Sequence, residues 1–243
     1  MRKAIADAAL IAWMETLKVR VAPAMYVIAI VFFPLGMLLF AKAMTPPGFD
    51  VGVRLVTGSL VFGLGLATVN LLAQFILFER FNNEMKLVVA SPVHPLSYAG
   101  GVLVYSVGQA LVTSAVILSF APLFDIDITL SFWLLPLLLL TALSMTGIAV
   151  VIATWAPSME AGNMMANTLG ILIVILSPIY YPIERLSEWL QWVARFSPYT
   201  HAGEAINKVL SGQGGFEREM LILAGITVVG LVIGILGLRW REA

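Results

Sequence analysis

The sequence predicts an all-α protein that crosses a membrane several times, because of its composition and its charge distribution. Hydrophobic residues make up 60% of the 243 residues and charged residues only 12%. In soluble domains, apolar residues make up about 45–50% and charged residues about 25%. The charges fall between long apolar stretches, and about 20 apolar residues suffice to cross a bilayer as a helix. Six stretches carry no Asp, Glu, Lys or Arg: Val21–Phe40, Leu55–Phe78, Leu87–Phe124, Ile128–Met159, Ala161–Ile183 and Met220–Leu238. We therefore predict a single membrane domain, residues 1–243, with six transmembrane helices.

Residues 1–20 predict an amphipathic helix that precedes the first span. On a helical wheel Lys3, Asp7, Glu15 and Lys18 share one side, and the other side is apolar. The apolar residues are Ile5, Ala6, Ala9, Leu10, Ala12, Trp13 and Leu17. Such a helix is typical of the membrane interface, with Trp13 at headgroup depth. The alternative is a short helix packed on protein.

The six spans follow in order, with turn-forming residues between most of them. We expect them at 21–41, 55–78, 96–124, 128–154, 160–177 and 220–238. Pro34 lies inside the first span and predicts a kink, which neighbouring helices can accommodate in a membrane. Asp125 and Asp127 mark a tight turn after the third span. These two carboxylates have no further ligands nearby, so we predict no metal site.

Residues 178–219 predict two short amphipathic helices between the last two spans. Apolar residues recur there at helical spacing: Leu186, Trp189, Leu190, Val193 and Phe196. Ser197-Pro198 predicts the N-cap and first position of the second helix, which should end at Ser211-Gly212. Glu204 and Lys208 are spaced to pair along it. We predict a re-entrant hairpin that dips into the outer leaflet, because aromatic residues favour the headgroup zone. An aromatic surface loop is the alternative.

Residues 79–95 form the most polar connector in the first two thirds of the chain. Charged residues (Glu79, Arg80, Glu84 and Lys86) surround apolar ones (Phe81, Met85, Leu87 and Val88). A short amphipathic helix of this kind docks in a groove on a partner protein; a solvated loop is the equal alternative.

The distribution of Lys and Arg predicts that both termini are cytoplasmic. With that orientation eight basic residues lie inside: Arg2, Lys3, Lys18, Arg20, Arg80, Lys86, Arg239 and Arg241. Six lie outside, four of them in the long connector 178–219. The excess on the inner side follows the positive-inside rule. We expect the protein in the cytoplasmic (inner) membrane.

Two segments resemble signatures of ABC-2-type permeases, the membrane subunits of ATP-binding-cassette exporters. Glu84–Val93, Glu-Met-Lys-Leu-Val-Val-Ala-Ser-Pro-Val, is similar to the family's inner-loop signature. Tyr181–Ile206, which begins Tyr-Pro-Ile-Glu-Arg-Leu, is similar to the signature before the sixth span. The resemblance is closest to the daunorubicin-resistance and nodulation-type exporter permeases. The chain departs from that pattern at Ser187, where proline is common, and at His201 and Asn207, where Tyr and Arg are more usual.

The resemblance implies an exporter half that moves an amphiphilic drug, a lipid or a lipid-linked glycan outward. Its inner loop would form a coupling helix received by a nucleotide-binding subunit, through Glu79, Arg80, Phe81, Glu84, Met85 and Lys86. The complex would hold two ATPase subunits and a second permease copy or paralogue. ATP and Mg would bind to the partner subunit, with no cofactor in this chain.

The residues themselves agree that the energy comes from a partner. No Lys follows the Gly-x-x-x-x-Gly-Lys-Ser/Thr spacing of a phosphate-binding loop. No ionisable residue lies deep in a span, which disfavours the alternative of an ion-coupled secondary transporter. Neither Gly-x-Ser-x-Gly nor His-Glu-x-x-His occurs, so an intramembrane enzyme is not expected. The net charge of zero argues against nucleic-acid binding.

Amides inside the spans are the candidate lining of a transport path. Asn70 and Gln74 lie four residues apart in the second span, and Glu160, Asn163 and Asn167 share a face of the fifth. In lipid such groups should face protein or a water-filled cavity. The predicted path consists of the four amides and two tyrosines: Asn70, Gln74, Asn163, Asn167, Tyr180 and Tyr181. The alternative is that the amides only hydrogen-bond neighbouring helices. Small residues, Gly230-x-x-x-Gly234 and Ala166-x-x-x-Gly170, predict close helix contacts.

Overall fold

The computed structural model describes residues 2–21, 23–45, 52–82 and 93–237, and these are helical with short connections. The first long helix is built from α2 (Pro23–Val27), η1 (Ile28–Phe32) and α3 (Phe33–Ala43). The second, here called α4–α5, joins α4 (Gly52–Gly65), η2 (Leu66–Leu71) and α5 (Leu72–Phe81). The other elements are α1 (Arg2–Lys18), α7 (Pro95–Phe120), η3 (Ala121–Phe124), α8 (Leu134–Trp155), α9 (Met159–Leu176), η4 (Ile183–Arg185), α10 (Glu188–Ala194), α11 (Pro198–Leu210) and α12 (Glu217–Gly237). The all-helical prediction is confirmed for the described residues.

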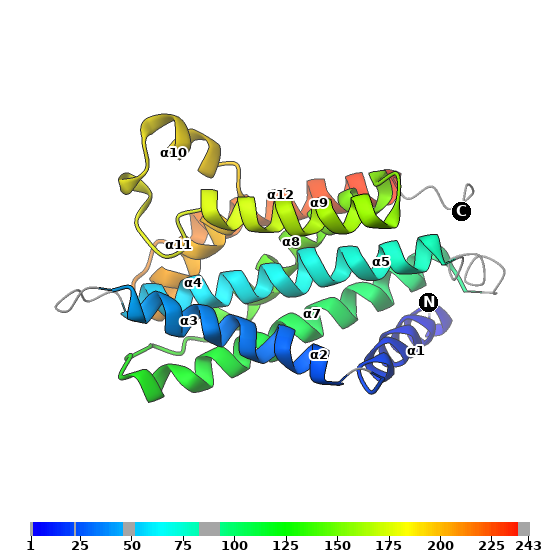
Figure 1. The fold of residues 1–243 in the computed structure, drawn as a ribbon, viewed down its shortest axis with the longest axis horizontal. Coiled ribbons are helices and arrows are strands. Elements are labelled where there is room, and N and C mark those ends of the chain that lie inside the picture. The colour runs from blue at the N-terminus through cyan, green and yellow to red at the C-terminus, as the bar shows by residue number, and fades with distance from the viewer. Residues whose placement is uncertain (1, 22, 46–51, 83–92, 238–243) are drawn as a thin grey trace.

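The long helices run side by side and form one bundle (Figure 1). At one end of the bundle lies α1, beside the end of α5; we call this the α1 end. At the other lie α10 and α11; we call this the α11 end. Three helices are long and apolar enough to cross a membrane, namely Gly52–Phe81, Ser97–Phe124 and Leu134–Trp155. The other three predicted spans coincide with helical runs at 23–43, 159–176 and 217–237.

The described helix ends lie within three residues of the expected bounds of the spans, except the start of α8, and two of these differences concern the connectors. Helix α4–α5 continues to Phe81, so the charged residues expected at the start of the connector lie on a helix. The fourth helix begins at Leu134 instead of residue 128. Asp125 adopts a left-handed conformation at φ 55°, which ends the preceding helix. The chain then runs along the α11 end, where Thr129 N donates to Leu210 O over 2.8 Å.

The proline in the first helix follows a π-helical turn. Pro34 comes two residues after the end of Ile28–Phe32, whose wider turns accommodate the ring and its missing N–H. A second π-helical turn, Leu66–Leu71, interrupts helix α4–α5 without a proline. Such turns are frequent at functional sites, and this one contains Asn70.

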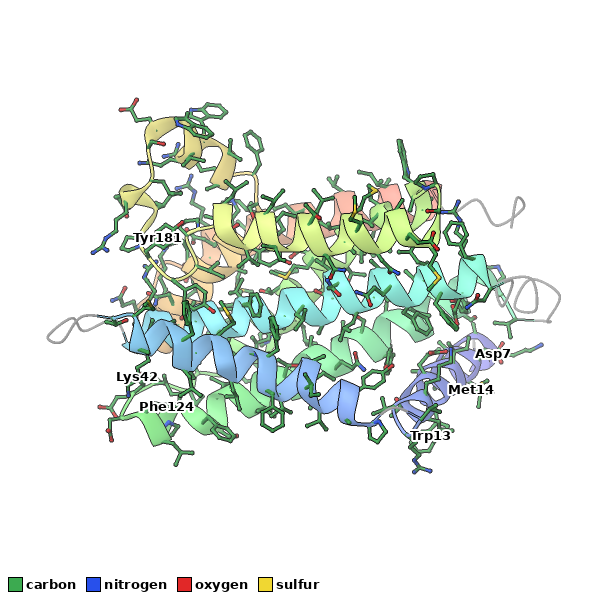
Figure 2. All side chains as sticks on the ribbon, in the orientation of Figure 1. Asp7, Trp13, Met14, Lys42, Phe124 and Tyr181 are labelled. Carbon is green, nitrogen blue, oxygen red and sulfur yellow. The ribbon has the colours of Figure 1, made fainter. Side chains whose placement is uncertain are left out.

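Helix α1 packs on the bundle through its polar side. A Cβ on Gly101 of α7 would lie 2.7 Å from the Ala8 carbonyl oxygen, so the two helices nearly touch. Glu15 faces the bundle and is only 5% exposed, whereas Trp13 and Met14 are more than half exposed. Figure 2 shows these two side chains on the side of α1 away from the bundle. The apolar side of α1 therefore remains uncovered by described residues.

Helix α11 begins and ends where the sequence predicts. Ser197 is the N-cap and its hydroxyl accepts from Tyr199 N, with Pro198 at the first helical position. The helix ends before Gly212, which has a positive φ of 67°. The predicted pairing of Glu204 with Lys208 is wrong, because tertiary partners take both charges. Glu204 lies 3.5 Å from Arg54, and Lys208 lies 3.2 Å from Glu219.

We expect Ser197→Ala to lower the stability of the protein by about 1 kcal/mol, the usual cost of a lost N-cap. The hydroxyl also shares a 2.7 Å hydrogen bond with Ser177 at the end of α9. Thermal unfolding of the solubilised protein measures the loss. Ser187→Ala is the matched control, since Ser187 caps α10 without a side-chain hydrogen bond. Equal losses in the two variants would contradict the role of the cap.

Candidate functional site

The predicted path amides meet where helix α4–α5 contacts α9. Asn70 Nδ2 donates to Asn167 Oδ1 over 2.6 Å, and Gln74 Nε2 donates to Asn70 Oδ1 over 2.6 Å. The bond between the two helices is what the helix-pairing alternative predicts. Asn167 is nevertheless an exposed residue, so these amides also reach the surface of the bundle.

The fourth amide, Asn163, lies one turn before Asn167 on α9. Its Oδ1 atom is buried and accepts no hydrogen bond within the described part of the chain. An amide oxygen in a low-dielectric setting is costly to leave without a donor. The amide cluster, defined as Asn70, Gln74, Asn163 and Asn167, therefore keeps one unused acceptor.

The two predicted path tyrosines lie elsewhere, at the α11 end. The ring of Tyr180 fills the space beside Gly58 of α4, where a Cβ would overlap the ring atoms. The carbonyl of Tyr181 accepts from Arg54 Nη1 over 3.1 Å. Gly58 precedes Asn70 by twelve residues, about 18 Å along a helix. The structure thus separates the predicted path residues into an amide cluster and a tyrosine pair.

The sequence reasoning missed the groups on α4 that receive the segment 178–210. Tyr199 is 1% exposed, and its ring and hydroxyl occupy the place where a Cβ of Gly65 would lie. Asn207 Nδ2 reaches Thr57 Oγ1 in a long hydrogen bond of 3.5 Å. One signal was present in the sequence: Gly58 and Gly65 are seven residues apart, so they share a face of the helix.

The predicted coupling residues that are described lie at the α1 end of helix α4–α5. Glu79 is 4% exposed, and Lys18 Nζ lies 3.3 Å from its Oε1 atom. Lys18 also lies 3.0 Å from Glu15 Oε2 and 4.6 Å above the ring of Phe75. One ammonium thus joins a carboxylate of α1 to one at the end of α5. Glu84, Met85 and Lys86 lie outside the described residues.

Arg80 closes the neighbouring end of α8. Its Nη1 atom donates to the carbonyls of Ala153, Thr154 and Ala156 over 2.8, 3.0 and 3.0 Å. The last carbonyls of a helix have no intrahelical donor and carry its partial negative charge. The guanidinium satisfies them, and it lies 5.0 Å from the ring of Phe81. Adjacent residues of α5 therefore hold α1 and α8 to the same helix end.

The charge environment of Lys18 favours its protonated form. Burial by itself lowers the pKa of Lys18, but the hydrogen bonds and charges of Glu15 and Glu79 outweigh that effect and raise it. Lys18 stays charged through the neutral range, and the link between α1 and α5 is present there.

Among the described residues, no group of three or more His, Cys, Asp or Glu side chains is placed to hold a metal ion. A comparison with curated proteins finds no match. A family model described as ABC-2 type transporter matches residues 8–210. Proteins of this family are multi-pass membrane permeases without an ATPase domain, and their ATPase partner binds the nucleotide. This chain belongs to the ABC-2 type transporter family, as the membrane permease component.

Proposed function

We propose that the protein is one half of an ATP-driven exporter that moves an uncharged or amphiphilic molecule outward through the cytoplasmic membrane. The observation that carries this proposal is the amide cluster, a set of neutral hydrogen-bonding groups where two largely apolar helices meet. The energy would come from a separate ATPase subunit, as the family implies. We further propose that the protein belongs with the daunorubicin-resistance and nodulation-type permeases, which its two connector motifs resemble.

The proposed topology has six spans and both termini in the cytoplasm, with the α1 end inside. Helix α1 would lie in the inner interface. Its buried Glu15 and exposed Trp13 support this, because the polar side is used on the bundle and the apolar side is left for lipid. At the α11 end, Trp189, Trp192 and Phe196 are each about two thirds exposed or more. Rings of this kind support a re-entrant segment in the outer leaflet.

The proposed cargo is a drug, a lipid or a lipid-linked glycan. Amides donate and accept hydrogen bonds without charge, so they suit hydroxyl, ether and amide groups better than ions. Exposed apolar residues beside them on α9, such as Met164 and Leu172, suit the hydrophobic part of an amphiphile. The path would be completed by a second permease, a copy or a paralogue, that faces α9.

The proposed coupling contact is the loop that follows Phe81. Two ATPase subunits would each receive one such loop, and Glu84, Met85 and Lys86 would enter the groove. The contacts of Glu79 and Arg80 with α1 and α8 support a transmitting role, since a force on the loop would reach three helices at once.

We expect Glu84→Ala combined with Met85→Ala to reduce co-purification of the ATPase subunit by about tenfold, as loss of an interface anchor does. Insertion into the membrane should be unchanged. Asp127→Ala with Leu130→Ala is the matched control, because it removes one exposed acidic and one exposed apolar residue at the α11 end. Unchanged co-purification in the Glu84 and Met85 variant would refute the coupling role. Transport that persists without the ATPase and collapses with an uncoupler would refute the proposed energy source.

A further inference from the structure

The segment 178–210 is fixed to the outer half of helix α4–α5 by interlocking side chains. Tyr180 fills the place beside Gly58, and Tyr199 fills the place beside Gly65, two helical turns further along. Tyr199 is buried to 1% exposure, so it cannot leave this place without opening a hole in the bundle. Both tyrosines and both glycines would have to separate together for α11 to move away from α4.

Polar contacts hold the same surfaces together at the α11 end. Arg54 bridges Glu204 of α11 at 3.5 Å and the Tyr181 carbonyl at 3.1 Å. The Asn207–Thr57 hydrogen bond adds a third link. Shape and charge thus hold α4, the Tyr180–Tyr181 pair and α11 together as a single body.

The contact of helix α4–α5 with α9 is tight near the α1 end, where a Cβ on Gly162 would lie 2.5 Å from a Leu77 methyl group, and it is more open beyond that point. Asn70 lies in a π-helical turn, a backbone geometry that is less regular than the α-helix. On the outer part of α9, Ile171 is 59% exposed and Leu172 is 45% exposed. A Cβ on Gly170 would meet no atom within 4 Å. The outer part of α9 is therefore covered on few sides.

The amides have an unused second pairing across this contact. Helix α4–α5 runs from the α11 end to the α1 end and α9 runs back, so the two are antiparallel (Figure 1). Four residues after Asn70 and four residues before Asn167 therefore lie at one level. Gln74 and Asn163 occupy these positions, yet Gln74 donates to Asn70 instead. Asn163 Oδ1 accepts no hydrogen bond from the described residues.

We infer that the amide cluster is a two-rung latch, closed at Asn70–Asn167 and open at Gln74–Asn163, and that the path opens here. Helix α4–α5 and α11 stay together, and the middle of α9, between its fixed ends at Gly162 and Ser177, shifts against helix α4–α5. The inference rests on the proposed transport function for its purpose. Its geometry rests only on the hydrogen bonds, the burial and the antiparallel register.

Cysteine pairs test the latch without background, because the chain contains no cysteine. The test pair is Asn70→Cys with Asn167→Cys, and the matched control pair is Thr57→Cys with Asn207→Cys. Both join helix α4–α5 to another element across a hydrogen bond of the structure. A short bis-methanethiosulfonate reagent links them in the complex with its ATPase, with and without ATP and vanadate. When ATP and vanadate are added, we expect the cross-linking rate of the test pair to fall about fivefold or more, the lower end of ordinary allosteric coupling. The cross-linking rate of the control pair should stay constant.

The outcomes separate the parts of the inference. A test pair that links at the same rate with and without nucleotide overturns the latch. A control pair that slows as much as the test pair overturns the single body. Failure of any ATPase to associate with the wild-type chain contradicts the proposed function instead.

The second rung, Gln74–Asn163, is tested by cross-linking in the permease chain alone, in lipid nanodiscs. Gln74→Cys with Asn163→Cys should link there, whereas Gln74→Cys with Asn167→Cys, one turn out of register, should link several-fold more slowly. Equal rates, or no link for the first pair, would overturn the two-rung arrangement whether or not an ATPase is found. Single-cysteine variants and gel filtration establish that each protein is folded.

Discussion

Gly147→Ala is expected to lower the stability of the protein by about 3 kcal/mol, at the upper end of the cost of overpacking. Helices α8 and α12 cross at this residue. A Cβ on Gly147 would lie 2.7 Å from the Cα atom of Gly230 and 3.2 Å from its carbonyl carbon. Backbone atoms cannot rotate away as a side chain does, so the helices would have to move apart. Thermal unfolding should show a fall of roughly 6–12 °C by the size scaling.

The control for this variant lies on α12 itself. A Cβ on Gly225 would meet no atom within 4 Å, so Gly225→Ala should leave stability unchanged or raise it slightly through helix propensity. Gly230→Ala should resemble Gly147→Ala, because its Cβ would lie 3.1 Å from the Gly147 Cα atom. If Gly147→Ala unfolded at the wild-type temperature, the close crossing of α8 and α12 would be wrong.

The sequence predicts a close contact for only one of the two glycines at this crossing. Gly230 belongs to a small-residue motif that predicts a close helix contact, and the structure confirms the contact at Gly230. Its partner Gly147 stands in no such motif. Gly170 belongs to a similar motif and meets nothing within 4 Å. Spacing shows where a helix offers a flat surface, but it does not show which helix, if any, covers that surface.

Local sequence signals predict this fold more accurately than signals that depend on distant residues. The start of α11 at Ser197-Pro198 and its end at Gly212 follow from cap chemistry, which depends on a few neighbouring residues. The pairing of Glu204 with Lys208 was wrong for the opposite reason. Arg54 stands 150 residues away in the sequence and takes Glu204 by tertiary contact. The spacing of two charges on one helix contains no information about such a partner.

The candidate site shows the same division. The sequence identified all four amides as groups that must face protein or water, because unsatisfied amides are costly in lipid. It did not determine which amide bonds to which, since the antiparallel register of two helices is set by their packing. Nor did it predict that Arg80 would close the end of α8, where three carbonyls from residues 153–156 meet its guanidinium.

Lys18→Met is the second variant for which we expect a large effect, a loss of about 2 kcal/mol in stability. Removing one partner of a buried ion pair costs about 3–5 kcal/mol, and the lower figure allows for the 42% exposure of the Lys18 side chain. Glu15 and Glu79 would remain 5% and 4% exposed in the wild-type geometry without the ammonium between them. We therefore also expect α1 to detach, which limited trypsin cleavage after Arg20 measures. Lys3→Met, at an exposed position of the same helix, should change neither readout.

The stability that Lys18 contributes should depend on pH in one direction only. The pKa of Lys18 is raised in the folded protein above the ordinary value of 10.5, so its contribution is fully present below pH 10.5. That contribution is lost as the pH rises through the raised value. The difference between wild type and Lys18→Met should therefore be constant through the neutral range and shrink only in strongly alkaline buffer. A difference that disappeared between pH 6 and pH 8 would contradict the pairing.

A double variant separates charge from packing at the same place. Glu79→Gln alone should cost less than Lys18→Met, because Lys18 keeps its 3.0 Å contact with Glu15. In the Lys18→Met background, Glu79→Gln should recover part of the lost stability, since it removes one of the two buried charges. Additive losses would mean that the contribution of Lys18 does not come from its pairing with Glu79. Recovery would mean that one ammonium holds α1 to the helix that leads into the proposed coupling loop.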